Sequence, residues 1–85
     1  MTDTLYHEKF PAGSSVRIVD RPALDEFRRS WKYHNKLEER QLGYHDQIAV
    51  VSQVGFYHGG DALYELDGVP GIWHECCLRP ASPVG

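Results

Sequence analysis

The chain has 85 residues, of which 41% are apolar and 12% aromatic, so it is not an intrinsically disordered polypeptide and should form one small folded domain. Nine basic and twelve acidic residues give a net charge of −3, which argues against a globally basic nucleic-acid coat or a membrane-surface protein. No apolar run approaches the roughly 18 residues that span a bilayer, and no signal peptide is visible, so we expect a cytoplasmic protein without a membrane partner.

The first residues, 1–12, predict a flexible leader that ends in a turn containing Pro11 and Gly13. Residues 15–19 alternate and are rich in β-branched side chains, which predicts a short strand with Val16 and Ile18 on one face.

A helical insertion is predicted over residues 21–42. Asp20 is a suitable N-cap, and Pro22 suits the first helical turn. Leu24, Phe27 and Trp31 have the spacing of one helix face, and Gly43 is placed to end the insertion.

The second half of the chain predicts a long hairpin and a short final strand. Residues 47–57 form the strongest strand pattern, and Gly55 within it suggests a bulge. A turn at residues 58–61 leads to a strand at 62–66, and 72–74 are extended. Residues 75–78 suggest a 3-10 turn before a strand around Leu78 and Arg79, and residues 81–85 form a tail. Five short strands that close on themselves would leave no exposed edge, so we predict a mainly β fold with a small barrel.

The order of these features resembles a known type of small barrel. It is carried by the strand Val16-Arg17-Ile18-Val19, then Trp31, Gly43, the valines Val50, Val51 and Val54, the pair Gly60-Asp61, Tyr64, Trp73 and the pair Cys77-Leu78. This order resembles the SH3-like barrels of the Mib/HERC2-repeat type. It is also similar to the SH3-like barrel at the C-terminal end of nitrile hydratase β subunits, where a tyrosine strand leads to a Trp-Glu and a Leu; the nearest match here is Trp73-His74-Glu75. The resemblance implies a five-stranded barrel over residues 13–80, with fold better specified than function. The aromatic and acidic loop residues of proline-binding SH3 domains have no counterpart here, so that activity is not implied.

The aromatic residues suggest a non-enzymatic module that binds a protein or peptide through an aromatic groove, or that self-associates as a homodimer. A five-stranded barrel holds only a few rings, so one or two are expected on the surface, where Tyr and Trp are common binding anchors. The candidate partner-binding residues are Trp31, Tyr33, His34, Tyr57 and Tyr64. For Trp31 the spacing from Phe27 favours a core role about twice as strongly as a surface role.

Nucleic-acid binding is the alternative hypothesis. Residues 28–36 combine cations with rings that can stack on bases, and contain no acid. The phosphate-binding candidates are Arg28, Arg29, Lys32 and Lys36. Because the whole chain is acidic and Glu38 and Glu39 follow immediately, we rank this hypothesis below protein binding.

A metal or thiol site, or a nitrile-hydratase-like accessory role, is the lowest-ranked alternative. His74 and Cys76 would share a strand face, with His58, His45 and Asp61 as further candidate ligands, but the spacings typical of zinc sites are missing. We therefore expect no metal and no cofactor. His74 beside Cys76 and Cys77 also suggests a nucleophile, but a third orienting group is missing and a barrel of this size leaves little room for a substrate. Adjacent cysteines rarely bridge each other, so two free thiols are expected.

Overall fold

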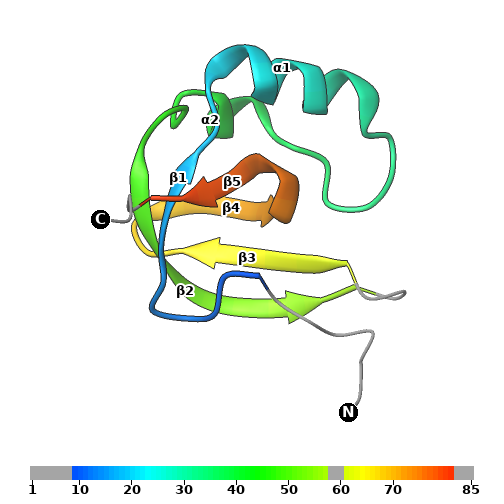
Figure 1. Cartoon of the computed structure of the whole chain (residues 1–85). Helices are drawn as coiled ribbons and strands as arrows, with labels where there is room; N and C mark the ends of the chain where they lie inside the picture. The colour runs from blue at the N-terminus through cyan, green and yellow to red at the C-terminus, as the bar shows by residue number, and fades with distance from the viewer. Residues whose placement is uncertain (1–8, 58–60, 82–85) are drawn as a thin grey trace.

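Five strands and two helices form the part of the chain that the computed structural model describes, residues 9–57 and 61–81 (Figure 1). The strands are β1 (Ser15–Ile18), β2 (Ile48–Phe56), β3 (Ala62–Leu66), β4 (Val69–His74) and β5 (Leu78–Pro80). The helices α1 (Arg21–Ser30) and α2 (Glu39–Leu42) lie between β1 and β2, and the 3-10 turn η1 (Glu75–Cys77) joins β4 to β5. The predicted mainly β domain with helices after its first strand is confirmed. The predicted turn at 58–61 falls largely outside the described residues.

The strands form one antiparallel sheet in the order β4-β3-β2-β1-β5. β2 is shared, because its first residues pair with β1 and its remainder pairs with β3. Within the described ranges β4 and β5 do not pair with each other, so the sheet stays open where a closed barrel was expected. Two features account for this opening. β5 has only three residues, and α2 packs alongside β4 instead of another strand.

The buried face of β2 is the one that carries its smaller side chains. Ala49 and Val51 point into the core, whereas Ile48 is 57% exposed and Val50 is 43% exposed. The register of the β2–β3 pair shifts between Val51 and Gln53, so the irregularity lies at Ser52 and not at Gly55, which pairs regularly with Leu63. The bulge therefore coincides with the change of partner strand, where an extra residue increases local bending.

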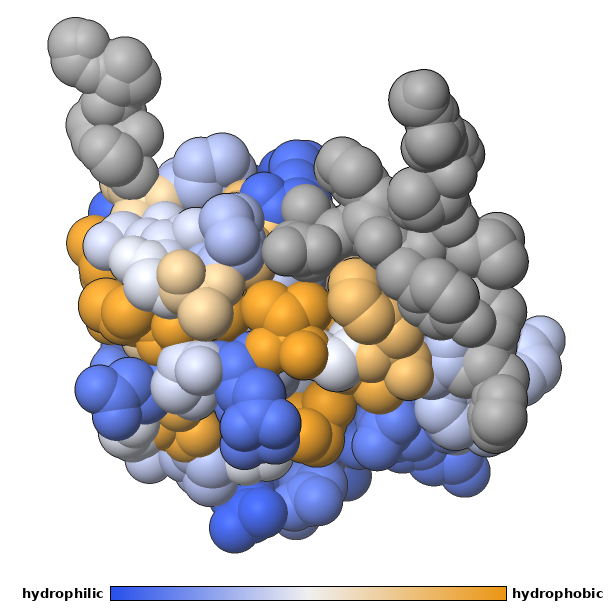
Figure 2. Space-filling view, turned by 90° about the horizontal axis from the view of Figure 1, so that it is seen from below, coloured by the Kyte–Doolittle hydropathy of each residue, from blue (hydrophilic) through white to orange (hydrophobic). Residues whose placement is uncertain are grey.

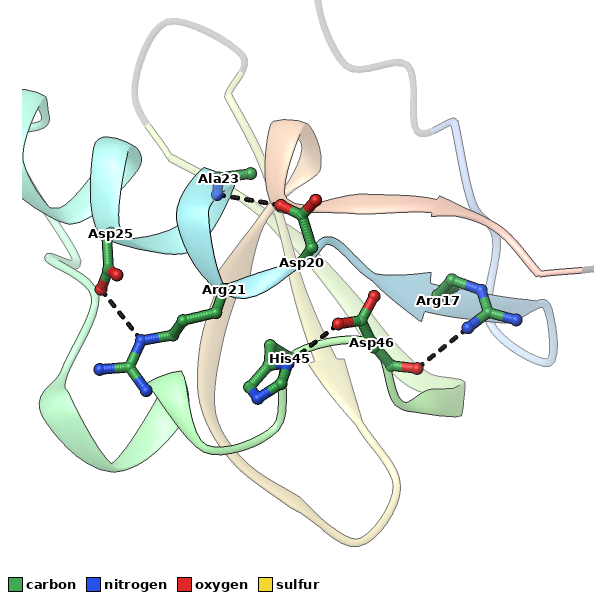
Figure 3. A network of polar contacts seen from close by, with 7 residues as sticks. All are labelled: Arg17, Asp20, Arg21, Ala23, Asp25, His45 and Asp46. Carbon is green, nitrogen blue, oxygen red and sulfur yellow. Dashed lines mark hydrogen bonds and ion pairs between the residues drawn. The ribbon is translucent and has the colours of Figure 1, made fainter.

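Helix α1 begins as the sequence predicts. The Asp20 side chain accepts a hydrogen bond of 3.0 Å from the backbone N–H of Ala23, and Pro22 occupies the first turn. Figure 3 shows this cap beside an i,i+4 ion pair between Arg21 and Asp25. The turn before β2 is fixed at Asp46, whose carbonyl accepts from Arg17 and whose φ of 65° is left-handed. Gly43, by contrast, has an ordinary helical φ of −71°, so the left-handed residue falls three positions after the predicted one.

One hydrophobic core lies between the sheet and the insertion. Its largest members are Trp73 and Tyr64, both fully buried. β4 contributes only Trp73 to the buried hydrophobic residues. The smaller buried residues come from the other strands, both helices, η1 and the segments between them, and include Phe10, Val16, Ile18, Leu24, Leu37, Leu42, Leu66, Cys77 and Leu78. Helix α1 contributes Leu24 to this core, with Phe27 packed against its rim, as their spacing predicts.

The Tyr64 hydroxyl joins three separated parts of the chain. It donates a hydrogen bond of 2.6 Å to Glu75 Oε2. It accepts bonds from the backbone N–H groups of Lys9, at 3.0 Å, and Phe10, at 3.3 Å. Burial, followed by the hydrogen bond to Glu75, raises the pKa of Tyr64 to about 12, so the phenol remains a donor at neutral pH.

Gln41 of α2 covers the edge of β4. This amide side chain is almost fully buried, and its Nε2 donates to the carbonyl of Ile72 at 3.0 Å. Its Oε1 accepts from the backbone N–H of Glu38 at 2.8 Å, which caps the start of α2. The amide passes over Gly71, where a Cβ atom would lie 2.6 Å from the Gln41 side chain. Gly71 also has a φ of 89°, so both its backbone and its surroundings require glycine.

We predict that Tyr64→Phe lowers the free energy of unfolding by about 2–3 kcal/mol. The ring still fills the core, but the substitution removes three hydrogen bonds. The Phe10 N–H then loses its partner, while the Lys9 N–H and Glu75 Oε2 keep only the bond to each other. Urea denaturation measures the loss. Tyr33→Phe removes a hydroxyl from an exposed ring and should change stability by less than about 0.5 kcal/mol. Equal effects of the two substitutions would contradict the bridging role of Tyr64.

We predict that Gly71→Ala is more destabilising than Gly68→Ala by about 2 kcal/mol. Both glycines have positive φ, so both substitutions carry the same type of backbone cost. Gly68 faces open space, whereas the new methyl group at position 71 would displace Gln41 from the edge of β4. Thermal unfolding of the two variants isolates this steric contribution. Equal melting temperatures would show that Gln41 moves aside at little cost.

Candidate binding surface

Six rings from four parts of the chain meet where the β2–β3 hairpin ends, and we call them the aromatic cluster: Phe27, Trp31, Tyr33, His34, Tyr57 and His74. The helical insertion contributes four of them, and the other two follow β2 and end β4. The cluster is therefore built by the fold from residues far apart in the sequence.

Trp31 organises the loop at residues 31–38. Helix α1 ends at Ser30, so Trp31 is extended and not helical as its spacing predicts, although its N–H still bonds to the Phe27 carbonyl at 2.8 Å. Its ring stacks on Phe27 with centroids 5.5 Å apart, and its indole N–H donates to the His34 carbonyl at 2.7 Å. This bond and the left-handed φ of 48° at Asn35 fold the loop back toward the sheet.

His34 connects this loop to the end of β2. Its imidazole stacks on the Tyr57 ring with centroids 3.6 Å apart and an angle of 8° between the planes. His34 Nε2 lies 3.3 Å from Asp61 Oδ2, which is within ion-pair distance but lacks the alignment of a hydrogen bond. A protonated His34 would therefore be attracted to the carboxylate at the start of β3.

His74 holds the loop against β4. Its ring packs 4.8 Å from Trp31 and 5.0 Å from Phe27. His74 Nε2 lies 2.9 Å from the Asn35 carbonyl; because a carbonyl only accepts, the proton is on Nε2. Burial lowers the pKa of His74, and the nearby His34 acts in the same direction, while the Asn35 carbonyl opposes them. His74 is thus a neutral donor at pH 7.

Four of the five predicted partner-binding residues belong to this cluster. Tyr33 is 69% exposed and Tyr57 is 40% exposed, while Trp31 and His34 are partly buried beside them. Tyr64 must be corrected, because its ring is fully buried in the core and its hydroxyl is used in the bridge to Glu75. We call Trp31, Tyr33, His34 and Tyr57 the aromatic surface.

Sequence reasoning missed Phe27, His74 and Asp61 as supports of this surface. His74 contacts Asn35 across 39 sequence positions, so neither spacing nor local composition signals the pair. Only the order of strands brings the end of β4 beside the end of the hairpin.

The basic candidates Arg28, Arg29, Lys32 and Lys36 are all exposed. They share the surface with acids, because Arg29 pairs with Glu26 and Arg21 pairs with Asp25 on the same helix. Asp25 also lines the shallow depression that contains Arg28 and Arg29. The charge on α1 is therefore mixed, although the segment 28–36 itself contains no acid.

The metal candidates do not converge in the described ranges, where no three of the His, Cys, Asp and Glu side chains are grouped for metal binding. His45 pairs with Asp46 and has no ring contact with the members of the aromatic cluster in the described ranges, and His58 lies outside the described residues. Cys76 is exposed and Cys77 is buried, while the Nε2 of His74 is bonded to Asn35.

A crevice of about 300 Å³ lies between the loop 31–38, α2 and β4. Its lining mixes Lys36, Glu38, Arg40 and Glu65, and Arg40 is already paired with Glu38 at 2.7 Å. The crevice therefore presents both signs of charge, partly neutralised, and lies beside the aromatic surface.

Comparison with known proteins gives no match to a family model, a curated protein or a solved structure. No helix in the described ranges is long and apolar enough to cross a membrane.

We predict that acidification weakens the fold through His74. Its pKa is lower in the folded chain than in the unfolded chain, so stability is fully present above about pH 6.5 and is lost as the pH falls toward the folded value. His74→Phe keeps a ring against Trp31 but removes the titrating group, so its stability should change less between pH 7 and pH 5. Melting curves of the parent and of His74→Phe at several pH values make the comparison, and an identical pH dependence of the two melting temperatures would contradict it.

Proposed function

We propose that this chain is a small non-enzymatic binding module that recognises a protein or peptide segment through the aromatic surface. The observation that supports this function most directly is that the rings of Tyr33 and Tyr57 are exposed and are nevertheless packed against neighbouring rings. Tyr33 is 69% exposed, yet its ring lies edge-on against Trp31 at 5.0 Å, and the exposed Tyr57 ring is stacked on His34.

Rings held in this way are suited to binding. A tyrosine offers a large apolar face and a hydroxyl, and a ring that is already packed loses little further freedom when a partner covers it. Binding energy in interfaces is concentrated in a few such aromatic anchors. An exposed Asp61 carboxylate and the exposed Lys32 and Lys36 provide a polar rim. We therefore infer a peptide that presents an apolar or aromatic side chain.

We further propose that the domain is a variant of the SH3-like barrel. The sharing of β2 between β1 and β3, the bend at its bulge and the 3-10 turn before β5 all support this assignment. The helical insertion then distinguishes the variant, because it provides four of the six rings of the aromatic cluster.

Nucleic-acid binding through Arg28, Arg29, Lys32 and Lys36 remains the lower-ranked hypothesis. On α1 the Glu26 carboxylate pairs with Arg29, and Asp25 lines the same depression as Arg28 and Arg29, so a polyanion would meet repulsion there. A second copy of the chain is the other alternative partner, since Figure 2 shows hydrophobic residues gathered on the face viewed from below. Independently of that view, Ile48 and Val50 are exposed apolar residues on one face of β2, and a contact between two copies at that face would cover them.

We predict that a random peptide display library yields ligands with at least micromolar affinity, and that Tyr33→Ala weakens them tenfold or more. A central aromatic anchor contributes on the order of 2 kcal/mol, which corresponds to about thirtyfold. Ile48→Ala removes an exposed apolar side chain outside the aromatic surface and is the matched control, for which affinity should be unchanged. Fluorescence anisotropy with the selected peptides gives the dissociation constants.

Two outcomes would reject this function. Failure to select any peptide, together with micromolar binding of single-stranded or duplex oligonucleotides at 150 mM salt, would favour the basic segment. Equal binding by the parent, Tyr33→Ala and Tyr57→Ala would show that ligands bind elsewhere. Sedimentation at micromolar concentration identifies a dimer, and its loss in Ile48→Ala but not in Tyr33→Ala would assign self-association to the face of β2.

A further inference from the structure

One face of the sheet, over β1, β5 and the first part of β2, is exposed and lies outside the aromatic surface. Residues directly opposite each other in an antiparallel pair point to the same face. Ile48 lies opposite Arg17, and Val50 lies opposite Ser15, and all four are exposed. Together with two charged neighbours they form what we call the outer face: Ser15, Arg17, Ile48, Val50, Asp67 and Arg79.

Two arginines carry positive charge at one corner of the outer face. Arg17 and Arg79 lie directly opposite each other on β1 and β5, where like charges repel. The Arg17 guanidinium is held by a bond of 3.1 Å to the Asp46 carbonyl, while the Asp46 carboxylate bonds to His45 (Figure 3). Neither arginine forms an ion pair within the described part of the chain, whereas three other arginines do. A carboxylate from another chain would therefore relieve the repulsion.

Asp67 carries negative charge at the opposite corner of the outer face. Its N–H donates to the Val50 carbonyl at 2.8 Å, and the pairing of Val51 with Leu66 places Asp67 opposite Val50. Because Leu66 is buried, the next side chain, the exposed Asp67, points to the outer side. Asp67 forms no ion pair with any other described residue. The outer face thus runs from cations, across two apolar side chains, to an acid.

We propose that the outer face binds a second copy of this chain in a symmetric dimer. In a two-fold contact both copies use the same face, so that face must be complementary to itself. A two-fold axis across the diagonal sets Arg17 of each copy against Asp67 of the other. The same axis brings Ile48 and Val50 of both copies together in the centre. Charge pairs at both ends and an apolar contact between them are then formed at once.

A second copy fits this face better than a partner of one charge. An acidic partner would be attracted by Arg17 and Arg79 but repelled by Asp67, and a basic partner would meet the reverse. A face of three short strands lies at the small end of interface sizes, so the dimer is weak and reversible. The contact uses no residue of the aromatic surface, and it goes beyond the proposed peptide binding without depending on it.

Analytical ultracentrifugation of the parent from about 10 μM to 1 mM measures the self-association, and we expect a reversible dimer. Arg17→Asp and Asp67→Arg each place like charges at both ends of the contact, so each variant alone should associate about tenfold more weakly or less. An equimolar mixture of the two variants should recover the dimer, because each end of the contact again joins an acid and an arginine. Arg28→Asp makes the same charge change on α1, outside the outer face, and should leave the dimer intact.

Circular dichroism verifies that each variant is folded. A parent that stays monomeric at about 1 mM, a dimer that survives either charge reversal, or a mixture that stays monomeric would overturn the proposal. An equal loss in Arg28→Asp would also overturn it, since only net charge would then matter. If a charge-reversed variant does not fold, Ile48→Ser decides the matter, because that side chain is already 57% exposed. Loss of the dimer in Ile48→Ser supports the contact, and its persistence contradicts it.

Discussion

The hydrogen-bonded hydroxyl of Tyr64 is the constraint on which much of this small domain depends. A chain of this length has one core and little redundancy, so a single buried polar group has large consequences. Here the ring of Tyr64 fills the centre of the core beside Trp73, while its oxygen holds the N-terminal segment and the turn η1. The position of η1 in turn fixes where β4 ends and where β5 begins. Tyr64 therefore contributes both to the packing of the core and to the hydrogen bonds that connect the N-terminal segment with η1.

The aromatic surface depends indirectly on the position of η1 that Tyr64 fixes. His74 is the last residue of β4, immediately before η1, and its imidazole supports the loop at Asn35. The loop carries Tyr33 and His34, and His34 places Tyr57. A surface made of exposed rings is thus supported by a buried neutral histidine, and its geometry follows from the end of a strand. Trp31, Tyr33 and His34 belong to one polar segment of the sequence, but the positions of their rings are fixed by contacts with the ends of β2 and β4.

The sequence predicts most of the helices and strands of this fold, but it does not predict that the sheet stays open instead of closing into a barrel. The cap at Asp20, the strand at residues 62–66 and the 3-10 turn at η1 depend on local chemistry, and they are found where local chemistry places them. The inward face of β2 is not determined locally, because both faces are apolar, and the smaller Ala49 and Val51 are the buried pair. The left-handed turn at Asp46 is fixed by hydrogen bonds to Ile18 and Val19, which a pattern centred on Gly43 does not reveal.

The sequence predicts the ring-bearing residues of the aromatic surface, but it does not predict the residues that support them. Tyr33 and His34 have no core role in the sequence pattern, but only Tyr33 is exposed, whereas the His34 side chain is 15% exposed beneath Tyr57. Tyr64 has the same residue type as Tyr57 and a similar strand context, yet only Tyr64 points inward, because the register of the β2–β3 pair sets its face. The pairing of His74 with Asn35 depends on tertiary contact alone.

The cover that α2 provides over β4 has a consequence for how this domain can meet other chains. An unpaired strand edge is a template for further strands, and it leads to uncontrolled polymerisation when it is long and flat. At β4 the Gln41 amide already bonds to the Ile72 carbonyl, and at the opposite end of the sheet β5 is three residues long and ends in Pro80, which has no N–H to donate. Both margins are thus poor templates for backbone pairing. Under the proposed binding function, a partner would therefore contact side chains on the faces and loops of this domain and would not extend its sheet.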